Sequence, residues 1–443
     1  MFTSLPGFRD FYPADCATKN YIFSVWHNIA QRYGFVEYDT PVLEPLGLFI
    51  QKSGPSITEQ LFSFTDQGGR KVALRPEMTP SLARIVGARA HSLQRPIKWY
   101  SIGNQFRFER SQKGRLRSFF QLNIDILGEH DQAADAEIIA HAVDTMKAFG
   151  CSHKNYHLRL SDRELWSYCL QCFGVQEKDF SSVLCIIDKI EKEKRSAIAE
   201  QLNVFLKDKT EGFMLAIDDL MRLKTIDDIQ SYICKDTSAL SDERRQALDR
   251  RIHEWKKLLS YLSAMGIMDW ISIDFSIVRG LAYYTGFIFE IFSTQGPSRA
   301  IAGGGRYDNL VHKLSGINMP AVGYAMGDVV LGNILRENNF TPKNCNTPDI
   351  FVIINGLPER MVALHDIALM RGMNLRVTFL LSEKTISRQL KHADREKAHI
   401  TVTYNASELL LNQITVRNLH TGHEFLVLRE HLLNILKKEL QSF

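Results

Sequence analysis

The chain has 443 residues, of which 45% are hydrophobic and 23% charged, a composition typical of a soluble globular protein with about two to four domains. No apolar run approaches the ~20 residues that span a bilayer, and residues 1–6 lack the basic and apolar regions of a secretory signal, so we expect a cytoplasmic protein without a membrane partner. The net charge of +4 permits a nucleic-acid partner without requiring one.

The seven cysteines are scattered and odd in number, which argues against a disulfide framework. Cys169 and Cys172 form a lone CxxC pair inside an apolar helical run. Because no second pair of ligands accompanies them, thiols of a core or a helix surface are favoured over a metal site. No set of metal ligands is indicated by spacing elsewhere.

The N-terminal part mixes helices and strands. Apolar residues at helical spacing from Tyr21 to Tyr33 predict a helix that stops at Gly34, followed by strand and loop over residues 35–45. The later elements expected here are strands over 97–102, 105–109 and 119–127, with a basic hairpin loop over 110–117, and a helix over 133–149.

Composition divides the rest of the chain. Residues 162–259 are rich in Lys, Glu, Asp, Leu and Ile, which predicts a helical insertion whose charge runs are solvated faces rather than a dedicated binding surface. The insertion splits one domain into residues 1–161 and 260–337. A polar segment with two prolines, residues 338–348, is the expected linker to a last domain over 349–443.

Strand and helix alternate in this last domain, which predicts a small α/β unit with a largely parallel or mixed sheet. The expected strands cover 350–354, 375–381 and 400–404, and the expected helices 361–371, 382–393 and 428–440. Ser382 is expected to cap the second helix, with Glu383 in its first turn.

One stretch, Arg279-Gly280-Leu281-Ala282-Tyr283-Tyr284, sets a permanent cation and two phenols beside a glycine turn. Residues 271–278 before it and 287–292 after it have the apolar patterns of strands, so the stretch is expected at the rim of a sheet. A rigid guanidinium held there fits the oxygens of a small carboxylate or phosphate ligand. A hairpin turn with an ordinary surface arginine is the alternative.

Other motifs add groups of the same kind. Arg107 stands at a strand end, where it can grip a phosphate, and the basic loop after it can follow a polyanion backbone. Gln121 and Asp125 are four residues apart on the return strand and therefore share one face of the sheet. Residues 303–305 are three glycines, which form either a turn or a close backbone approach to a ligand.

Taken together and in this order, the motifs resemble the histidyl-tRNA synthetases, a family of class II aminoacyl-tRNA synthetases, over nearly the whole chain. Residues 41–45 resemble the dimer-interface motif of the class, and residues 106–125 its second motif with the loop. The stretches 279–284 and 303–308 resemble the two segments peculiar to the histidine enzymes. The last hundred residues, including 382–384 and 389–394, resemble their anticodon-binding domain.

The resemblance implies an α+β class II catalytic domain, an antiparallel sheet flanked by helices, with a helical insertion and a C-terminal α/β anticodon-binding domain. It implies a homodimeric histidine–tRNA ligase that activates L-histidine with ATP to histidyl-adenylate and transfers it to tRNA(His). Mg²⁺ is implied by ATP. The insertion is expected over the tRNA acceptor stem.

The resemblance also implies residue roles by position. The catalytic residues are Arg107, Gln121 and Arg279. Histidine is bound by Glu77, Met78, Thr79, Arg107, Gln121, Asp125, Arg279, Tyr283, Tyr284 and Tyr307. ATP is bound by Arg107, Glu109 and Arg279, and the tRNA by Gln112, Lys113 and Arg115. Within the histidine set, Glu77 and Thr79 hold the α-amino group, and Asp125 and Tyr284 read the imidazole.

The third class motif departs from the family. Val329 and Val330 stand where the family has an acid and an arginine that packs on the adenine, and Asp328 is one residue early. Valine cannot make a cation–π contact, worth about 0.5–2 kcal/mol. Either another cation covers the adenine, or ATP binds differently, or catalysis is impaired.

Two other functions remain as hypotheses. The regulatory subunit of histidine biosynthesis shares the synthetase fold without charging tRNA, but it usually lacks an anticodon domain. A plain α/β nucleic-acid-binding protein explains the basic loop and leaves Glu77, Gln121 and Asp125 unexplained.

Overall fold

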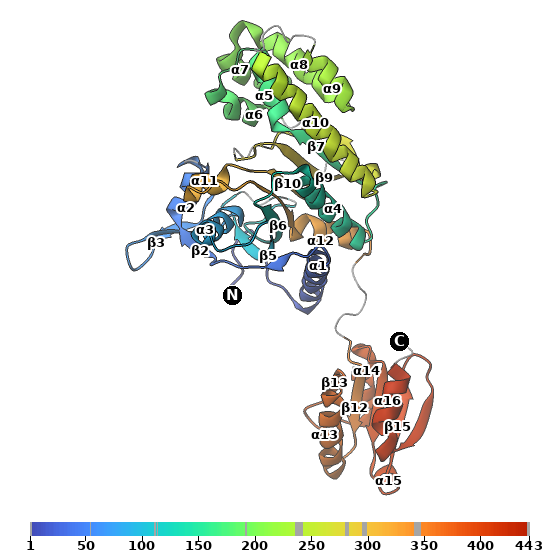
Figure 1. The fold of residues 1–443 in the computed structure, drawn as a ribbon. Coiled ribbons are helices and arrows are strands. Elements are labelled where there is room, and N and C mark those ends of the chain that lie inside the picture. The colour runs from blue at the N-terminus through green and yellow to red at the C-terminus, as the bar shows by residue number, and fades with distance from the viewer. Residues whose placement is uncertain are drawn as a thin grey trace. The chain divides into compact units, whose positions relative to one another are not determined.

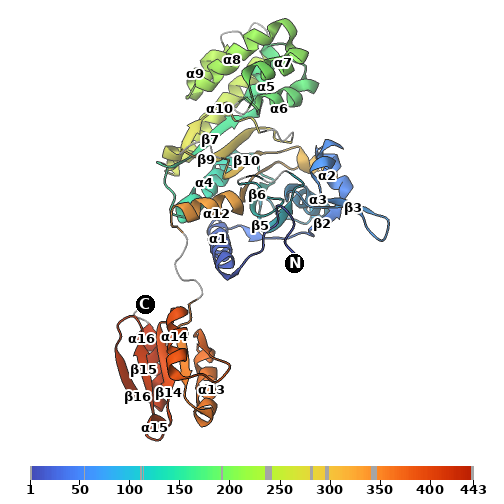
Figure 2. The same ribbon diagram turned by 180° about the vertical axis from the view of Figure 1, so that it is seen from behind.

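The computed structural model describes residues 2–53, 55–109, 112, 114–190, 193–234, 242–279, 283–294, 299–340 and 347–440. Contacts divide the chain into two compact units, Met1–Thr341 and Pro342–Phe443 (Figure 1 and Figure 2). Of the helices in these ranges, none is long and apolar enough to cross a membrane.

A large sheet with the strand order β1-β5-β6-β11-β10-β9-β7-β8 forms the centre of the first unit. Neighbours pair antiparallel except at the two edges, where β1 runs parallel to β5 and β7 parallel to β8. The strands are β1 Val36–Glu37, β5 Ile97–Phe106, β6 Ser118–Leu127, β7 Tyr156–Asp162, β8 Ile271–Ile273, β9 Phe287–Ser293, β10 Ala302–Arg306 and β11 Ala321–Gly327. The expected antiparallel-rich sheet is confirmed.

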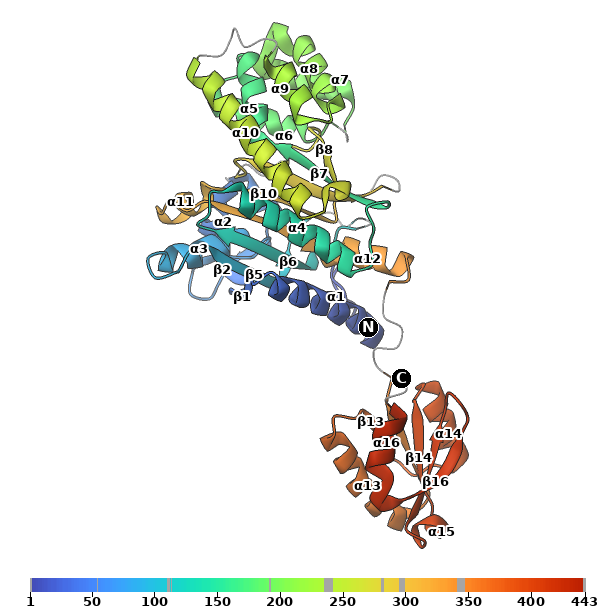
Figure 3. The ribbon, with the colours of Figure 1, turned by 45° about the vertical axis from the view of Figure 1, so that its right-hand side comes forward.

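Three helices cover one face of this sheet: α1 Pro13–Arg32, α4 Gln132–Ala148 and α12 Asp328–Glu337 (Figure 3). Strand β6 shows why this face is apolar. Its alternate residues Leu122, Ile124 and Ile126 are buried in the core shared with α1 and α4. The residues between them point to the opposite face, which carries the polar side chains.

The opposite face is only partly covered. Helices α3 Thr79–Arg89 and α11 Leu310–Ser315 pack together, and Leu82 and Leu310 share a buried cluster with Ile97 and Ile288 of the sheet. Next to them lie α2 Leu46–Ser53 and a small sheet with the order β2-β4-β3, formed by Leu43–Pro45, Lys71–Leu74 and Ser63–Thr65. This arrangement leaves part of the sheet open beside α3.

Two strand predictions need correction, and the turn considered for residues 303–305 is excluded. The two strands expected over 97–102 and 105–109 are one strand, β5, which ends at Phe106, because residues 103 and 104 also pair in the ladder, Gly103 with Gln121 and Asn104 with Phe120. The expected strand over 271–278 ends at Ile273, since Oδ1 of Asp274 accepts a hydrogen bond from the Ser276 amide and turns the chain. The three glycines form strand β10 rather than a turn.

The insertion is helical, as expected. Its helices are α5 Arg163–Cys172, α6 Phe180–Ile187, α7 Arg195–Leu206, α8 Thr210–Arg222, α9 Ile226–Cys234 and α10 Asp242–Ala264, the last running five residues beyond the predicted end. Asp162 joins the two ends of the insertion: Oδ1 caps α5 at the Glu164 amide (2.7 Å), and Oδ2 accepts from Arg251 Nε (2.7 Å) and Trp255 Nε1 (2.6 Å) of α10. The CxxC pair lies on α5, where Cys169 is buried and Cys172 partly buried.

The second unit has a mixed sheet with the order β13-β12-β14-β15-β16. Strand β12 runs parallel to both β13 and β14, and β14-β15-β16 are antiparallel. The strands are Ile350–Ile354, Val377–Phe379, Ile400–Tyr404, Gln413–Asn418 and Glu424–Leu428 for β12 to β16. The helices are α13 Leu357–Gly372, α14 Ile386–Arg395, α15 Ala406–Leu409 and α16 Leu432–Leu440.

Three helix predictions in this unit were wrong at their starts. Helix α13 begins at Leu357, four residues before the predicted start at 361. Helix α14 begins at Ile386 with Thr385 as its N-cap, so Ser382 does not cap it. The last helix begins at Leu432, because Leu428 ends strand β16 and pairs with Gln413 of β15. Strand β13 is also shorter than the predicted 375–381.

Candidate active site

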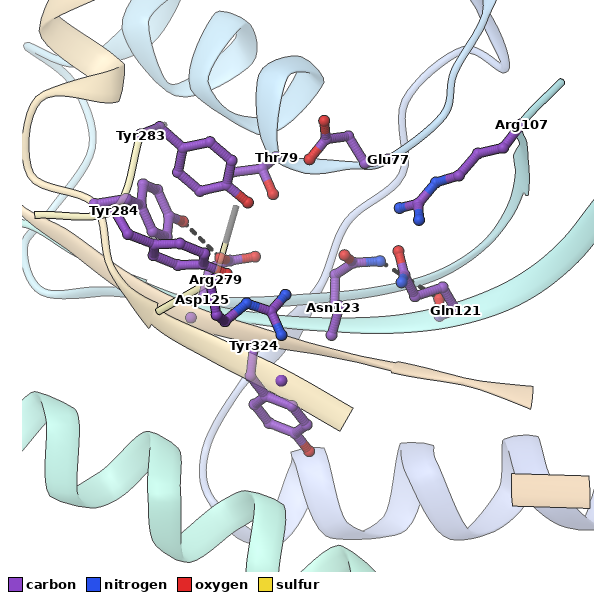
Figure 4. Close-up of a pocket in the computed structure, with 14 residues that line it drawn as sticks. Glu77, Thr79, Arg107, Gln121, Asn123, Asp125, Arg279, Tyr283, Tyr284 and Tyr324 are labelled. Atoms are coloured by element: carbon purple, nitrogen blue, oxygen red, sulfur yellow. Dashed lines mark hydrogen bonds between the residues drawn. The ribbon is translucent and has the colours of Figure 1, made fainter. Parts of the chain in front are cut away.

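A pocket opens on the polar face of the large sheet, between α3 and the strands β6, β11 and β10 (Figure 4). Its lining residues share this face or its rim: Glu77, Thr79, Arg107, Gln121, Asn123, Asp125, Arg279, Tyr283, Tyr284, Gly303, Tyr307, Gly323, Tyr324 and Ala325. The structure therefore brings together residues predicted from five separate segments of the sequence.

Strand β6 supplies one side of the pocket. Gln121, Asn123 and Asp125 follow each other at every second residue and so point to the same face. Asn123 was not predicted, although its place between two predicted residues at period two indicated it. Its amide nitrogen Nδ2 lies 3.5 Å from the carbonyl oxygen of Gln121.

The floor of the pocket is a buried carboxyl group. Asp125 is only 4% exposed, and Tyr307 Oη donates a hydrogen bond to its Oδ1 across 2.5 Å. Burial raises the pKa of Asp125 to about 7, and the hydrogen bond from Tyr307 opposes that rise. Gly323 makes room for this group, because a Cβ there would lie 2.0 Å from Oδ1.

Arg279 brings a cation to the pocket from the other side. Its backbone is left-handed, with φ 51°, and its Nη1 donates to Glu290 Oε1 at 2.5 Å. Gly303 is the reason that the guanidinium fits, since a Cβ on Gly303 would lie 1.9 Å from Nη1. Arg163 Nη1 donates to the carbonyl oxygen of Arg279 at 3.3 Å. The predicted Gly280, Leu281 and Ala282 lie outside the described residues.

A second cation, Arg107, follows the end of β5. Its Nε donates to the carbonyl oxygen of Pro76 at 3.0 Å, and its Cζ lies 5.3 Å from the centroid of the Phe119 ring. Figure 4 shows Arg107 on the side of the pocket near Gln121, away from Tyr284. Two permanent positive charges thus line one pocket.

The remaining wall combines acid and aromatic groups. Glu77 and Thr79 come from the turn before α3 and its first residue. The rings of Tyr283 and Tyr284 have centroids 4.6 Å apart, and Tyr283 meets Tyr307 edge-on at 5.9 Å. Glu77 forms an ion pair with Lys52, a buried residue that no motif indicated.

Met78, Glu109 and the loop residues lie outside the pocket lining. The Met78 sulfur accepts a hydrogen bond from Thr40 Oγ1 at 3.3 Å in a fully buried position. Glu109 pairs with Arg115 across the basic loop. Gln112 accepts from Arg299 Nη2 at 2.6 Å, and Lys113 lies outside the described residues.

Val330 and Asp328 belong to the segment in which the third class motif departs from the family, and the structure shows the surroundings of both. Val330 Cγ2 and Arg299 Cδ each lie 3.4 Å from the position of a Cβ built on Gly114, so both side chains reach the basic loop at this glycine. Asp328 is buried and accepts hydrogen bonds from Arg9 Nη2 (2.7 Å) and the Phe120 amide (2.9 Å). Asp328 therefore ties the N-terminal segment to β6.

Tyr324 differs from the other lining residues, because its ring points away from the pocket (Figure 4). Its hydroxyl lies 2.9 Å from Nδ1 of His141 in α4. Burial lowers the pKa of His141 to about 3, so this pair stays uncharged inside the core.

Comparison with known proteins identifies the family. A family model described as histidyl-tRNA synthetase matches residues 7–328, and one described as anticodon binding domain matches residues 360–439. The chain is 44% identical over 437 residues to the histidine–tRNA ligase of Opitutus terrae, covering 97% of each chain. It is 35% identical to the chloroplastic/mitochondrial histidine–tRNA ligase of Arabidopsis thaliana, covering 95% of this chain and 84% of that one.

A solved structure supports the fold. The histidyl-tRNA synthetase of Nostoc sp. PCC 7120 superposes with a TM-score of 0.80 at 22% identity and covers 99% of both chains. The matched model spans the pocket residues, and the curated relatives match along nearly the whole chain. On these grounds the chain belongs to the histidyl-tRNA synthetase family.

Proposed function

We propose that this aminoacyl-tRNA ligase activates L-histidine with ATP to histidyl-adenylate and transfers the histidyl group to tRNA(His). The observation that carries the proposal is the convergence of Arg107 and Arg279 on one pocket with the Asp125–Tyr307 pair at its floor. A site of this kind offers cations to a carboxylate and a phosphate, and a hydrogen-bonding carboxyl group to a ring nitrogen.

Histidine is proposed to enter with its imidazole toward Asp125 and Tyr284. The α-amino group then faces Glu77 and Thr79, with Gln121 beside it, while Tyr283 and Tyr307 enclose the side chain. A carboxyl group that titrates near neutral pH can either accept from or donate to an imidazole nitrogen. An apolar ligand leaves this buried group unpaired, and sites of this type reject such analogues by about 10⁴-fold or more.

The chemical step requires a carboxylate oxygen to attack the α-phosphate of ATP, which displaces pyrophosphate. We propose that Arg279 bridges the histidine carboxylate and the α-phosphate, and that Arg107 binds the same phosphate from the other side. Positioning and charge stabilisation then supply most of the rate gain. The pocket carboxylates are already engaged, Glu77 with Lys52 and Asp125 with Tyr307. Magnesium is therefore proposed to arrive on the triphosphate, and no step is assigned to it.

The adenine end needs a cation other than the missing third-motif arginine. We propose Arg299 for this role, because its side chain and that of Val330 both approach Gly114, and its guanidinium reaches the basic loop at Gln112. Burial and the nearby Arg115 lower the pKa of Arg299, with Glu109 opposing, which is consistent with a guanidinium held among charged groups rather than in open solvent. Glu109 is proposed to contribute to the nucleotide site from the same loop.

The tRNA is proposed to contact the protein at three places. Gln112, Lys113 and Arg115 face its 5′ end, the insertion over residues 162–259 lies over the acceptor stem, and residues 349–443 bind the anticodon. The catalytic domain then comprises residues 1–161 and 260–337, and 338–348 form the linker.

The working form is proposed to be a homodimer in the cytoplasm. Val36, Val42 and Leu43 leave apolar side chains exposed at the β1 and β2 edges, where the class motif of the dimer interface lies. Free thiols at Cys16, Cys151 and Cys169 suit a reducing compartment.

Histidine-dependent exchange of labelled pyrophosphate into ATP tests the function. We expect exchange with histidine and none without it. The competing function is a histidine-binding regulatory subunit, which the match to an anticodon binding domain over residues 360–439 disfavours. Folded protein that binds histidine but gives no exchange at saturating substrate supports that competing function instead.

A further inference from the structure

A buried lysine lies behind the wall of the pocket. Lys52 is in the last turn of α2, and its side chain is 1% exposed. Lysine is almost never buried to this degree without a partner, because removing an ammonium from water is costly. The cost of burying Lys52 must therefore be offset by a specific interaction of its ammonium group.

The ammonium group meets two pocket residues at once. It forms an ion pair with Oε1 of Glu77, and Nζ lies 3.9 Å from the centroid of the Tyr283 ring. Glu77 and Tyr283 both line the pocket, whereas Lys52 contacts them from within the protein. A lysine ammonium has three donors, so it can bind a carboxylate and face an aromatic ring together.

The charges around Lys52 define its role more closely. Burial lowers the pKa of Lys52, the adjacent Glu77 opposes this, and the positive charges of Arg107 and Arg279 lower it further. Glu77 is thus the anion that keeps a cation at this position. In return, the ammonium fixes the carboxylate, whose second oxygen remains available to the pocket.

We propose that Lys52 is a positioning residue for the amino-acid site, holding Glu77 and Tyr283 where they receive the histidine substrate. This rests on the proposed function, because the substrate assigned to Glu77 is the α-amino group of histidine. Lys52 joins segments remote in sequence: the turn before α3, which carries Glu77, and the stretch after Arg279, which carries Tyr283. Among the described residues, neither Lys52 nor Glu77 has another ion-pair partner.

The test is Lys52→Met, which keeps an unbranched side chain of similar length and removes the charge. In the pyrophosphate exchange assay we expect the KM for histidine to rise by roughly tenfold or more, the loss that follows when a charge-assisted hydrogen bond disappears. The KM for ATP is expected to change less than about threefold. The affinity loss should be larger for histidine than for imidazolepropionate, which lacks the α-amino group.

A double-mutant cycle with Glu77→Gln separates positioning from general destabilisation. If Lys52 acts through Glu77, the double variant should bind histidine about as poorly as Glu77→Gln alone. Lys313→Met is the matched control, because Lys313 Nζ donates to the carbonyl oxygen of Lys52 at 3.1 Å without an ion pair to Glu77. We expect this control to keep the histidine KM of the unchanged protein.

Two results overturn the proposal: an unchanged histidine KM in folded Lys52→Met, or additive losses in the cycle. If Lys52→Met does not fold, Lys52→Gln replaces it. Its amide keeps a hydrogen-bond donor but loses the charge that pairs with Glu77 and faces Tyr283, so we expect a smaller rise in the histidine KM, and no rise at all overturns the proposal. Exchange by the unchanged protein is measured alongside. Its failure refutes the proposed function, whereas normal exchange with an insensitive Lys52 refutes only the positioning role.

Discussion

Tyr307 donates its phenolic hydrogen to Oδ1 of Asp125 across 2.5 Å, and the two residues are 2% and 4% exposed. This pair places a carboxyl group at the floor of the pocket in surroundings that disfavour its charge. The pKa of Asp125 rises to about 7 because of burial, and only one hydrogen bond offsets that cost. The protein therefore retains at this position a group that lowers its stability near neutral pH.

Asp125→Asn is expected to stabilise the protein while impairing histidine activation. Because the folded state holds the Asp125 proton until about pH 7 and the unfolded chain loses it near pH 4, the contribution of Asp125 to stability falls as pH rises between these values. The variant should equal the unchanged protein at pH 4 and exceed it at pH 8 by about 2–4 kcal/mol. Urea unfolding at both pH values measures the difference. A variant that is less stable at pH 8 contradicts this expectation.

Arg279→Ala is expected to abolish adenylate formation with a modest loss of stability. The substitution removes the guanidinium that faces the pocket, and loss of one such charge from a transition state costs about 10²–10³-fold or more in rate. Pyrophosphate exchange and thermal unfolding provide the two measurements. Arg195→Ala is the control, since Arg195 pairs with Asp218 on the insertion surface. Near-normal exchange by Arg279→Ala removes the role assigned to this residue.

Gly303→Ala is expected to reduce exchange by displacing Arg279, although the substitution removes no polar group from the site. The added methyl would lie 1.9 Å from Arg279 Nη1 and 3.1 Å from Glu290 Cγ, so the guanidinium must move. A displacement of this kind costs about 10²-fold in rate. Gly372→Ala, where no atom lies within 4 Å of the new Cβ, serves as the control. Equal exchange activity of Gly303→Ala and Gly372→Ala argues that the position of the Arg279 guanidinium does not matter for the reaction.

Arg299→Ala is expected to raise the KM for ATP by about fivefold to twentyfold and to leave the KM for histidine nearly unchanged, as loss of a cation–π contact predicts. Adding Val330→Arg to this variant should recover part of the ATP affinity, because both side chains approach Gly114. Initial rates over an ATP concentration series decide the matter. An unaltered KM for ATP in Arg299→Ala assigns the adenine to another group.

Removal of the residues after Pro348 is expected to weaken aminoacylation of tRNA far more than adenylate formation. Met1–Thr341 is a compact unit by its own contacts, and it contains every residue that lines the pocket. Comparing pyrophosphate exchange with tRNA charging in the truncated protein measures the two steps. Parallel losses in both assays contradict a separate anticodon module.

The sequence predicted those elements whose apolar spacing was undisturbed. Helices α1 and α4 and strands β9, β12 and β14 were found because each buries one continuous face or run. The sequence did not predict strand β10, because its three glycines show no alternation of apolar and polar side chains. In the second unit the sequence predicted neither β15 nor β16, and only Leu428, the last residue of β16, fell inside the expected last helix over 428–440.

The site was easier to predict than its supports. Arg107, Asp125 and Arg279 belong to motifs with a chemical reason for their residue types, and they do line one pocket. Lys52 and Arg163 reach the same pocket through contacts with Glu77 and with the Arg279 carbonyl oxygen. No local pattern marks such residues, because their partners lie more than a hundred positions away or in another element. Only the folded chain reveals them.

The three glycines of β10 have a consequence for variation in this protein. Built Cβ atoms at Gly303, Gly304 and Gly305 would lie 1.9 Å from Arg279, 2.2 Å from the Gly323 oxygen and 2.5 Å from the Phe287 oxygen. The absence of side chains at these glycines leaves the room that the neighbouring atoms occupy. Even alanine is therefore a large change at each of these three positions. Any other residue adds at least the same Cβ atom, so the surrounding atoms must move to accommodate it.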